Sequence, residues 1–204
     1  MSGVAVMIYM RIDQVMIKNM LGVEALGIYS AMLPIAMAPN FIPMIVSVVL
    51  MPILSRLHAE DKSRYRRLLV LTFWVSFYGA LLFSVILAML SEFIIQVLFG
   101  SAFERSADVL AVYVFSNCFT WLGVAHSLWL VNEKKGIVRL YGTLAGAAVC
   151  VVLNAALIPE LGLSGAAVVA IVAQFVSVVG INIFFARESF MLQLEGVLFI
   201  KKGV

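Results

Sequence analysis

The chain has 204 residues, of which 64% are hydrophobic and 12% charged, and its formal net charge is +3. Soluble domains have about 45–50% apolar and about 25% charged residues, so a soluble globular fold is excluded because its interior is too small for this much apolar surface. The basic residues sit in short loops between apolar stretches, which indicates membrane topology rather than nucleic-acid binding. No segment alternates with the two-residue period of barrel strands, so we predict an all-α, polytopic membrane protein.

Six apolar stretches approach or exceed the roughly 20 helical residues that a bilayer core requires. In chain order the predicted transmembrane helices are Gly3–Met20, Ala25–Ser55, Leu68–Leu90 with a continuation towards Phe99, Asp108–Val131, Val138–Ile158 and Leu163–Ala186. Residues 1–187 are therefore expected to form one six-helix bundle and residues 188–204 a cytoplasmic tail. The apolar patch at 197–200 in this tail fits either a segment lying on the membrane surface or a frayed end.

Orientation follows from the basic residues, because cytoplasmic loops carry an excess of Lys and Arg. Eleven of the fourteen fall on one side: Arg56, Lys62, Arg64, Arg66, Arg67, Lys134, Lys135, Arg139, Arg187, Lys201 and Lys202. We predict that this side and both termini are cytoplasmic in a multi-pass protein of the cell (inner) membrane. The aromatic residues Tyr65, Trp74, Trp129 and Tyr141 lie near the same helix ends and are expected to be interfacial anchors.

The first predicted helix carries charges within the membrane. A charge at the bilayer centre costs about 2.5–3.5 kcal/mol on insertion scales, so exposure of Arg11 and Asp13 to lipid is disfavoured. Arg11 and Lys18 are seven residues apart, about two turns, and share a face with Gln14, whereas Asp13 lies roughly 200° around from Arg11. We expect Arg11, Gln14 and Lys18 to line a cavity, and Asp13, with Tyr9, to face a neighbouring helix in a structural or ion-coupling role. Alternatively, Arg11 and Asp13 pair with charges elsewhere in an assembly and serve only to hold that assembly together.

The second predicted helix contains four of the five prolines. An interior proline removes a backbone hydrogen bond and bends a helix, and broken helices in membranes are found where protein or a wet cavity surrounds them. We therefore predict a gating helix whose break involves Pro34, Pro39, Asn40 and Pro43. A static kink that improves packing explains the same residues equally well.

Several short segments resemble the second half of lipid-linked oligosaccharide (O-antigen or polysaccharide) flippases of the multidrug/oligosaccharidyl-lipid/polysaccharide exporter superfamily. The matching segments are Arg11-Ile-Asp13-Gln-Val-Met-Ile, Gly22-Val-Glu24-Ala-Leu-Gly27-Ile-Tyr29-Ser-Ala31, Pro52-Ile-Leu-Ser55-Arg56, Leu98-Phe99-Gly100, Leu153-Asn154 and Gly165-Ala166-Ala167. They cover nearly the whole chain in order and spacing. The resemblance implies two six-helix bundles around a central cavity, of which this sequence supplies one.

What the resemblance implies is flipping of a polyprenyl-pyrophosphate-linked oligosaccharide for surface polysaccharide (including lipopolysaccharide) synthesis. The cationic face of Arg11, Gln14 and Lys18 suits such an anionic lipid, because arginine binds phosphate in a bidentate fork. The expected partners are the lipid-linked oligosaccharide, membrane lipid and a second six-helix half, partner chain or homodimer mate, with no nucleic acid. A cation-coupled multidrug exporter and a non-transporting scaffold of a polysaccharide assembly complex remain alternatives.

No catalytic constellation is visible in the sequence: there is no Ser/His/Asp set, no phosphate-cradling glycine loop and no metal-ligand cluster. The two cysteines, Cys118 and Cys150, fall inside apolar helices and are interpreted as small core residues. We therefore expect a protein that is not an enzyme and that needs no cofactor or metal.

Overall fold

The computed structural model describes residues 11–198, and every regular element in this range is helical, which confirms the predicted all-α class for this part of the chain. In chain order the elements are α2 Ile12–Leu21, α3 Val23–Met37, the 3₁₀ turn η1 Ala38–Asn40, α4 Phe41–Glu60, α5 Lys62–Met89, α6 Ser91–Phe99, the 3₁₀ turn η2 Ser101–Phe103, α7 Glu104–Tyr113, α8 Ser116–Asn132, α9 Gly136–Phe175, the π-helix η3 Val176–Gly180, α10 Asn182–Phe185 and α11 Arg187–Leu198.

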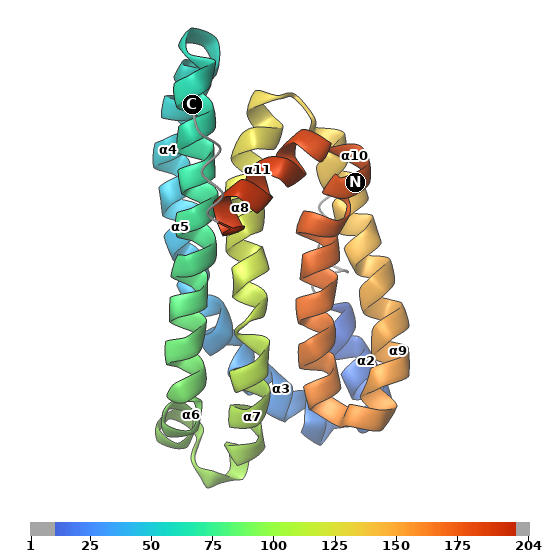
Figure 1. Cartoon of the computed structure of the whole chain (residues 1–204). Coiled ribbons are helices and arrows are strands. Elements are labelled where there is room, and N and C mark those ends of the chain that lie inside the picture. The colour runs from blue at the N-terminus through green and yellow to red at the C-terminus, as the bar shows by residue number, and fades with distance from the viewer. Residues whose placement is uncertain (1–10, 199–204) are drawn as a thin grey trace.

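The long helices run side by side along one axis, and α8 packs against α4, α5 and α9 (Figure 1). Three helical segments are long and apolar enough to cross a membrane, namely Val23–Glu60, Lys62–Met89 and Gly136–Phe185. The pair Ser101–Tyr113 and Ser116–Asn132, bent by 46°, adds a fourth if it forms one span. The described part of the chain thus contains three to four apolar helices able to span a membrane, and the count of six stays a prediction, since residues 3–10 of the first predicted helix lie outside the described range.

Helix α9 reverses direction at Gly162, so that its two arms lie antiparallel in Figure 1. Gly162 has φ 61° and ψ −138°, a conformation that residues with a Cβ rarely adopt. Three residues later, a Cβ on Gly165 would lie 2.6 Å from the carbonyl oxygen of Leu157, so only glycine allows the two arms to approach this closely. The hairpin therefore depends on one glycine for its turn and on another for its packing.

The core forms two main clusters, one at each end of the bundle. The cluster at the α2–α3 end includes Ile17, Tyr29 and Met32, and the cluster at the α11 end includes Phe73 and Trp129. The prediction that Tyr65 and Trp129 are interfacial anchors is wrong, because their exposed fractions are only 5% and 0%. Helix α11 packs over this end of α5 and α8 and covers the apolar surface that the sequence assigned to the membrane interface.

The described part of the C-terminal tail is the helix α11, not a frayed end. Arg66 Nη2 donates to both carboxylate oxygens of Glu195, at 2.6 and 2.8 Å, which joins α11 to α5. Next to it, a Cβ on Gly196 would lie 2.7 Å from Phe73 Cβ, so the two helices are in close contact. The patch beyond Leu198 lies outside the described residues.

At the opposite end, α5 stops at Met89 and α6 follows as a separate helix, so the predicted continuation towards residue 99 is wrong.

Candidate functional site

Helix α2 starts directly after Arg11 and presents a polar face away from the core. The Arg11 side chain is exposed, and its Nη1 lies 3.5 Å from Gln14 Oε1. Lys18 is also exposed, two turns beyond Arg11 on the same helix. The structure thus brings Arg11, Gln14 and Lys18 onto one face of α2. Their role in binding a substrate stays a prediction.

Asp13 points to the other side of α2, towards α3. Tyr29 Oη donates to Asp13 Oδ2 at 2.7 Å, and the backbone N–H of Gln14 donates to Asp13 Oδ1 at 2.8 Å. Tyr29 is fully buried and meets Tyr113 of α7 edge-to-face, with 6.0 Å between ring centroids. The carboxylate is therefore held by two donors within the bundle. Tyr9, which was predicted to face a neighbouring helix together with Asp13, is outside the described residues.

Two cavities adjoin this arrangement. One of about 70 Å³ is lined by Asp13, Tyr113, Cys150 and Gln174, among others. A larger one of about 370 Å³ lies between α8, α9 and η3, and Gln174 lines it too. Its other lining residues are both polar and apolar, and the polar ones are Thr120, His126, Ser127, Arg139, Thr143 and Ser177. The two cavities thus share Gln174 as a lining residue.

The predicted gating helix is broken where its prolines are concentrated. Pro39 and Asn40 belong to the 3₁₀ turn between α3 and α4, and Pro34 and Pro43 lie on either side of it. Pro43 has no N–H for the carbonyl of Pro39, which instead accepts from the backbone N–H of Phe41. The prolines therefore replace one stretch of regular helix by a tighter turn. The gating role of Pro34, Pro39, Asn40 and Pro43 stays a prediction.

Two side chains of helix α8 hydrogen-bond to the broken turn. Asn117 Nδ2 donates to the carbonyl oxygen of Ala36 at 2.9 Å, and Trp121 Nε1 donates to Asn40 Oδ1 at 2.9 Å. Asn117 and Trp121 are four residues apart and so lie on one face of α8. Asn40 was predicted to be part of the helix break because it follows Pro39. In the structure, its side-chain oxygen accepts the hydrogen bond that joins the turn to α8.

The partners of Asp13 and Asn40 were not found from the sequence. The contact of Tyr29 with Asp13 could have been predicted, because a hairpin that turns at Gly22 brings residues at similar distances from the turn opposite each other. The contact of Trp121 with Asn40 could not, since the two residues are 81 positions apart and no local sequence pattern joins them. Local spacing thus assigns a side chain to a helix face, but the tertiary fold decides what that face meets.

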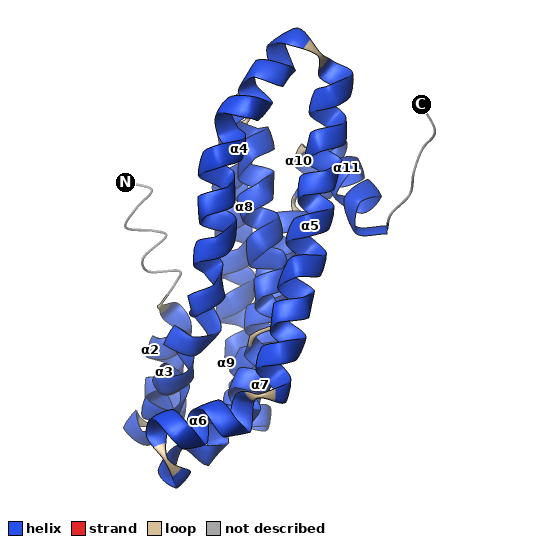
Figure 2. Cartoon of the chain, turned by 90° about the vertical axis from the view of Figure 1, so that its left-hand side faces the viewer, coloured by secondary structure: helices blue, strands red, loops and turns tan. Residues whose placement is uncertain are grey.

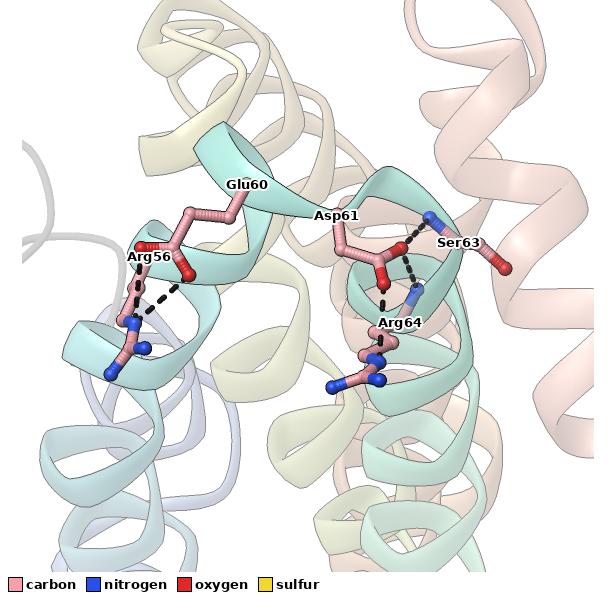
Figure 3. A network of polar contacts seen from close by, with 5 residues as sticks. All are labelled: Arg56, Glu60, Asp61, Ser63 and Arg64. Atoms are coloured by element: carbon pink, nitrogen blue, oxygen red, sulfur yellow. Dashed lines mark hydrogen bonds and ion pairs between the residues drawn. The ribbon is translucent and has the colours of Figure 1, made fainter.

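The end of the bundle predicted to be cytoplasmic carries a charged hairpin between α4 and α5, shown in Figure 3. Arg56 Nε donates to both oxygens of Glu60, at 3.2 and 3.0 Å. Asp61 caps α5 by accepting from the backbone N–H groups of Arg64 and Ser63, both at 3.0 Å (Figure 3). The Arg64 backbone hydrogen bond is the main cause that lowers the pKa of the Asp61 carboxyl, and the Ser63 hydrogen bond and the Arg64 side chain act in the same direction.

Comparison with known proteins identifies the family. The family profile described as "Polysaccharide biosynthesis protein" matches residues 1–108. The chain belongs to this family. The flippase-type resemblance predicted from its residues is thereby confirmed. Among curated proteins, the chain is 22% identical over 184 residues to "Capsular polysaccharide biosynthesis protein CapF" of Staphylococcus aureus, over 86% of this chain and 45% of that protein. The chain thus spans about half the length of this relative. No solved structure matches it.

Proposed function

We propose that this polysaccharide biosynthesis protein forms one half of a flippase that moves a polyprenyl-pyrophosphate-linked oligosaccharide across the plasma membrane. The observation that carries the proposal is an exposed cationic face on a helix of a membrane protein of this family. Family membership supports a role in polysaccharide synthesis or export. The face on α2 supplies the chemistry that an anionic lipid carrier requires.

The geometry of α2 leaves its cations available to a phosphate. Asp13 is the only acidic residue between Arg11 and Leu21, and its carboxylate is turned away from Arg11 and accepts from the Tyr29 hydroxyl and from the backbone N–H of Gln14. Within residues 11–198, the guanidinium of Arg11 donates to the Gln14 side-chain amide oxygen at 3.5 Å, a long hydrogen bond that a phosphate would displace readily. Lys18 lies about 10 Å along the helix, and two long side chains at this separation can converge on one pyrophosphate.

A second six-helix half is part of the proposal. In a lone bundle, Arg11 and Lys18 would be exposed to lipid. A charge near the bilayer centre costs about 2.5–3.5 kcal/mol on insertion scales. Alternating access in transporters built from repeats places the substrate site between the two units. We propose that the partner half, whether on another chain or on a longer form of this one, closes the cavity in front of the α2 face. The bundle would then contribute six spans: the helix containing α2, α3–α4, α5, α7–α8 and the two arms of α9.

The test is export of surface polysaccharide in cells that depend on this protein. Arg11→Ala should abolish export while the protein remains at normal abundance, and Arg11→Lys should restore only part of it, because a lysine cannot bind phosphate in a fork. Arg64→Ala, which removes an exposed arginine at the α4–α5 hairpin, is the matched control and should export normally. Full export by Arg11→Ala would refute the substrate face. Loss of the protein itself would favour an assembly role for this residue.

A further inference from the structure

Helix α6 lies across the axis of the bundle instead of along it. It is seen end-on below α5 in Figure 1 and along its length in Figure 2, so the two views agree. The break between the helices is at Leu90. The charge-free stretch 68–90 that precedes α6 is long enough, at about 1.5 Å per residue, to cross a bilayer core of about 30 Å. A chain that enters the core near Leu68 therefore leaves it where α6 begins.

Three different faces run along α6. Ser91 and Ile95 are buried against the bundle, with 4% and 0% exposed fractions, and α6 packs on α7 through this side. Glu92 and Gln96, one turn apart, form an exposed polar stripe beside it. The remaining face is apolar and open: it consists of Phe93, Val97 and Leu98, and Met89 and Leu90 just before the helix adjoin it, with exposed fractions from 45% to 81%.

The open apolar face continues the outer face of α5. Along α5, Val75, Leu82, Ile86 and Met89 are exposed at spacings of three to four residues or their multiples, and this row ends where the open apolar residues Leu90 and Phe93 follow. In a membrane-spanning helix, such an exposed apolar row faces lipid chains. The row therefore passes from lipid beside α5 onto α6 without interruption by a polar residue.

We propose that α6 is an interfacial amphipathic helix, which lies in the bilayer surface opposite the Arg56–Arg67 loop. Its apolar face enters the lipid just below the headgroups, and Glu92 and Gln96 face water. Such helices bury their apolar side about 5–10 Å into the boundary between headgroups and acyl chains. The occupant of this face is thus lipid. The inference rests on α5 crossing the membrane and does not require that the protein transports a substrate.

Nitroxide scanning of the full chain in phospholipid vesicles tests this placement. In a Cys118→Ala, Cys150→Ala background, a label at position 93 or 97 should collide more with oxygen than with a water-soluble nickel chelate, which gives a positive depth parameter. Labels at positions 92 and 96 are the matched controls on the same helix and should give the opposite sign. Equal access of the chelate to 93 and 96 would place the face in water. Low access of both reagents at 93 and 97 would mean that protein covers it. Either result overturns the proposal.

A second measurement keeps both cysteines. Photocrosslinking from benzoylphenylalanine at position 93 of the otherwise native chain should add the mass of a phospholipid, whereas the same group at position 96 should not. Crosslinks from position 93 to protein alone would contradict the lipid assignment, independently of the cysteine-free background.

Discussion

Two of the helix breaks in the described part of the bundle, the α3–α4 turn and η3, are held in different ways. The break between α3 and α4 is made by prolines and is held by Asn117 and Trp121, two uncharged side chains of the single helix α8. The break at η3 has no proline. Its π-helical hydrogen bond runs from Ile181 N–H to the carbonyl oxygen of Val176, five residues back, at 3.0 Å.

The second break is secured by the chain that follows it. The carbonyl oxygen of Val178 accepts from Asn182 Nδ2 at 2.6 Å and from Gln193 Nε2 at 3.3 Å, and Asn182 Nδ2 also lies 3.3 Å from Gln193 Oε1. Gln193 belongs to α11, which the Arg66–Glu195 ion pair joins to α5. We therefore expect the proline break to be the part of the bundle that can move, and η3 to be a fixed support.

The largest effect is expected from Gly142, on the arm of α9 that faces η3. A Cβ there would lie 2.4 Å from the backbone carbonyl oxygen of Ser177, which has no side-chain freedom to retreat. Gly142→Ala should therefore lower the free energy of unfolding by about 1–3 kcal/mol, the usual range for overpacking. Thermal unfolding in detergent measures this. Gly136→Ala, on the same helix with open space around it, is the control and should be neutral or stabilising. Equal midpoints for both variants would show that η3 is not tightly packed.

A smaller and more selective effect is expected from the two sets of side-chain hydrogen bonds. Trp121→Phe removes the donor to Asn40, and Gln193→Leu removes a donor to Val178. Each loss should lower the free energy of unfolding by about 0.5–1.5 kcal/mol. Amide hydrogen exchange followed by mass spectrometry separates them. Trp121→Phe should speed exchange in residues 36–43 and leave 176–182 unchanged, and Gln193→Leu should do the reverse. Faster exchange in both regions with either variant would mean that the two breaks are coupled, against the distinction drawn above.

The smallest effect is expected from the Asp61 cap at the α4–α5 reversal, because Asp61 and its ion-pair partner Arg64 are both exposed. Since folding lowers the pKa of Asp61, its contribution to stability is present above the unfolded-state pKa and is lost as pH falls through the folded-state pKa, below about pH 4. Asp61→Asn keeps a side chain that caps helices well but does not titrate. The thermal midpoint of the wild type should therefore fall relative to that of Asp61→Asn in this acid range only. Parallel pH profiles would show that the cap does not contribute.

The sequence predicted what local rules determine. Charge-free runs predicted the apolar helices, the prolines predicted the broken turn around Asn40, and helical spacing separated the face of Arg11 from that of Asp13. These features depend on residues within a few turns of one another, so their pattern is readable without a fold.

What the sequence did not predict depends on contacts between distant segments. Nothing local marks η3, because its π-helical register is held by Gln193 from a later helix. Trp129 looked like an interfacial anchor because it ends an apolar run, but α11 packs over this end of the bundle. Likewise, Phe93 looked like a continuation of a spanning helix, since hydrophobicity alone does not show where a helix changes direction.

The most direct test of the proposed function is reconstitution with a fluorescent lipid-linked oligosaccharide. The chain would be purified in mild detergent, its oligomeric state measured, and the protein inserted into vesicles alone or together with a second six-helix half. We predict that the lone bundle does not flip the lipid, that the paired halves do, and that Arg11→Ala in the paired form abolishes flipping while both halves still co-purify. A stable monomer of this chain that flips the lipid by itself would contradict the account.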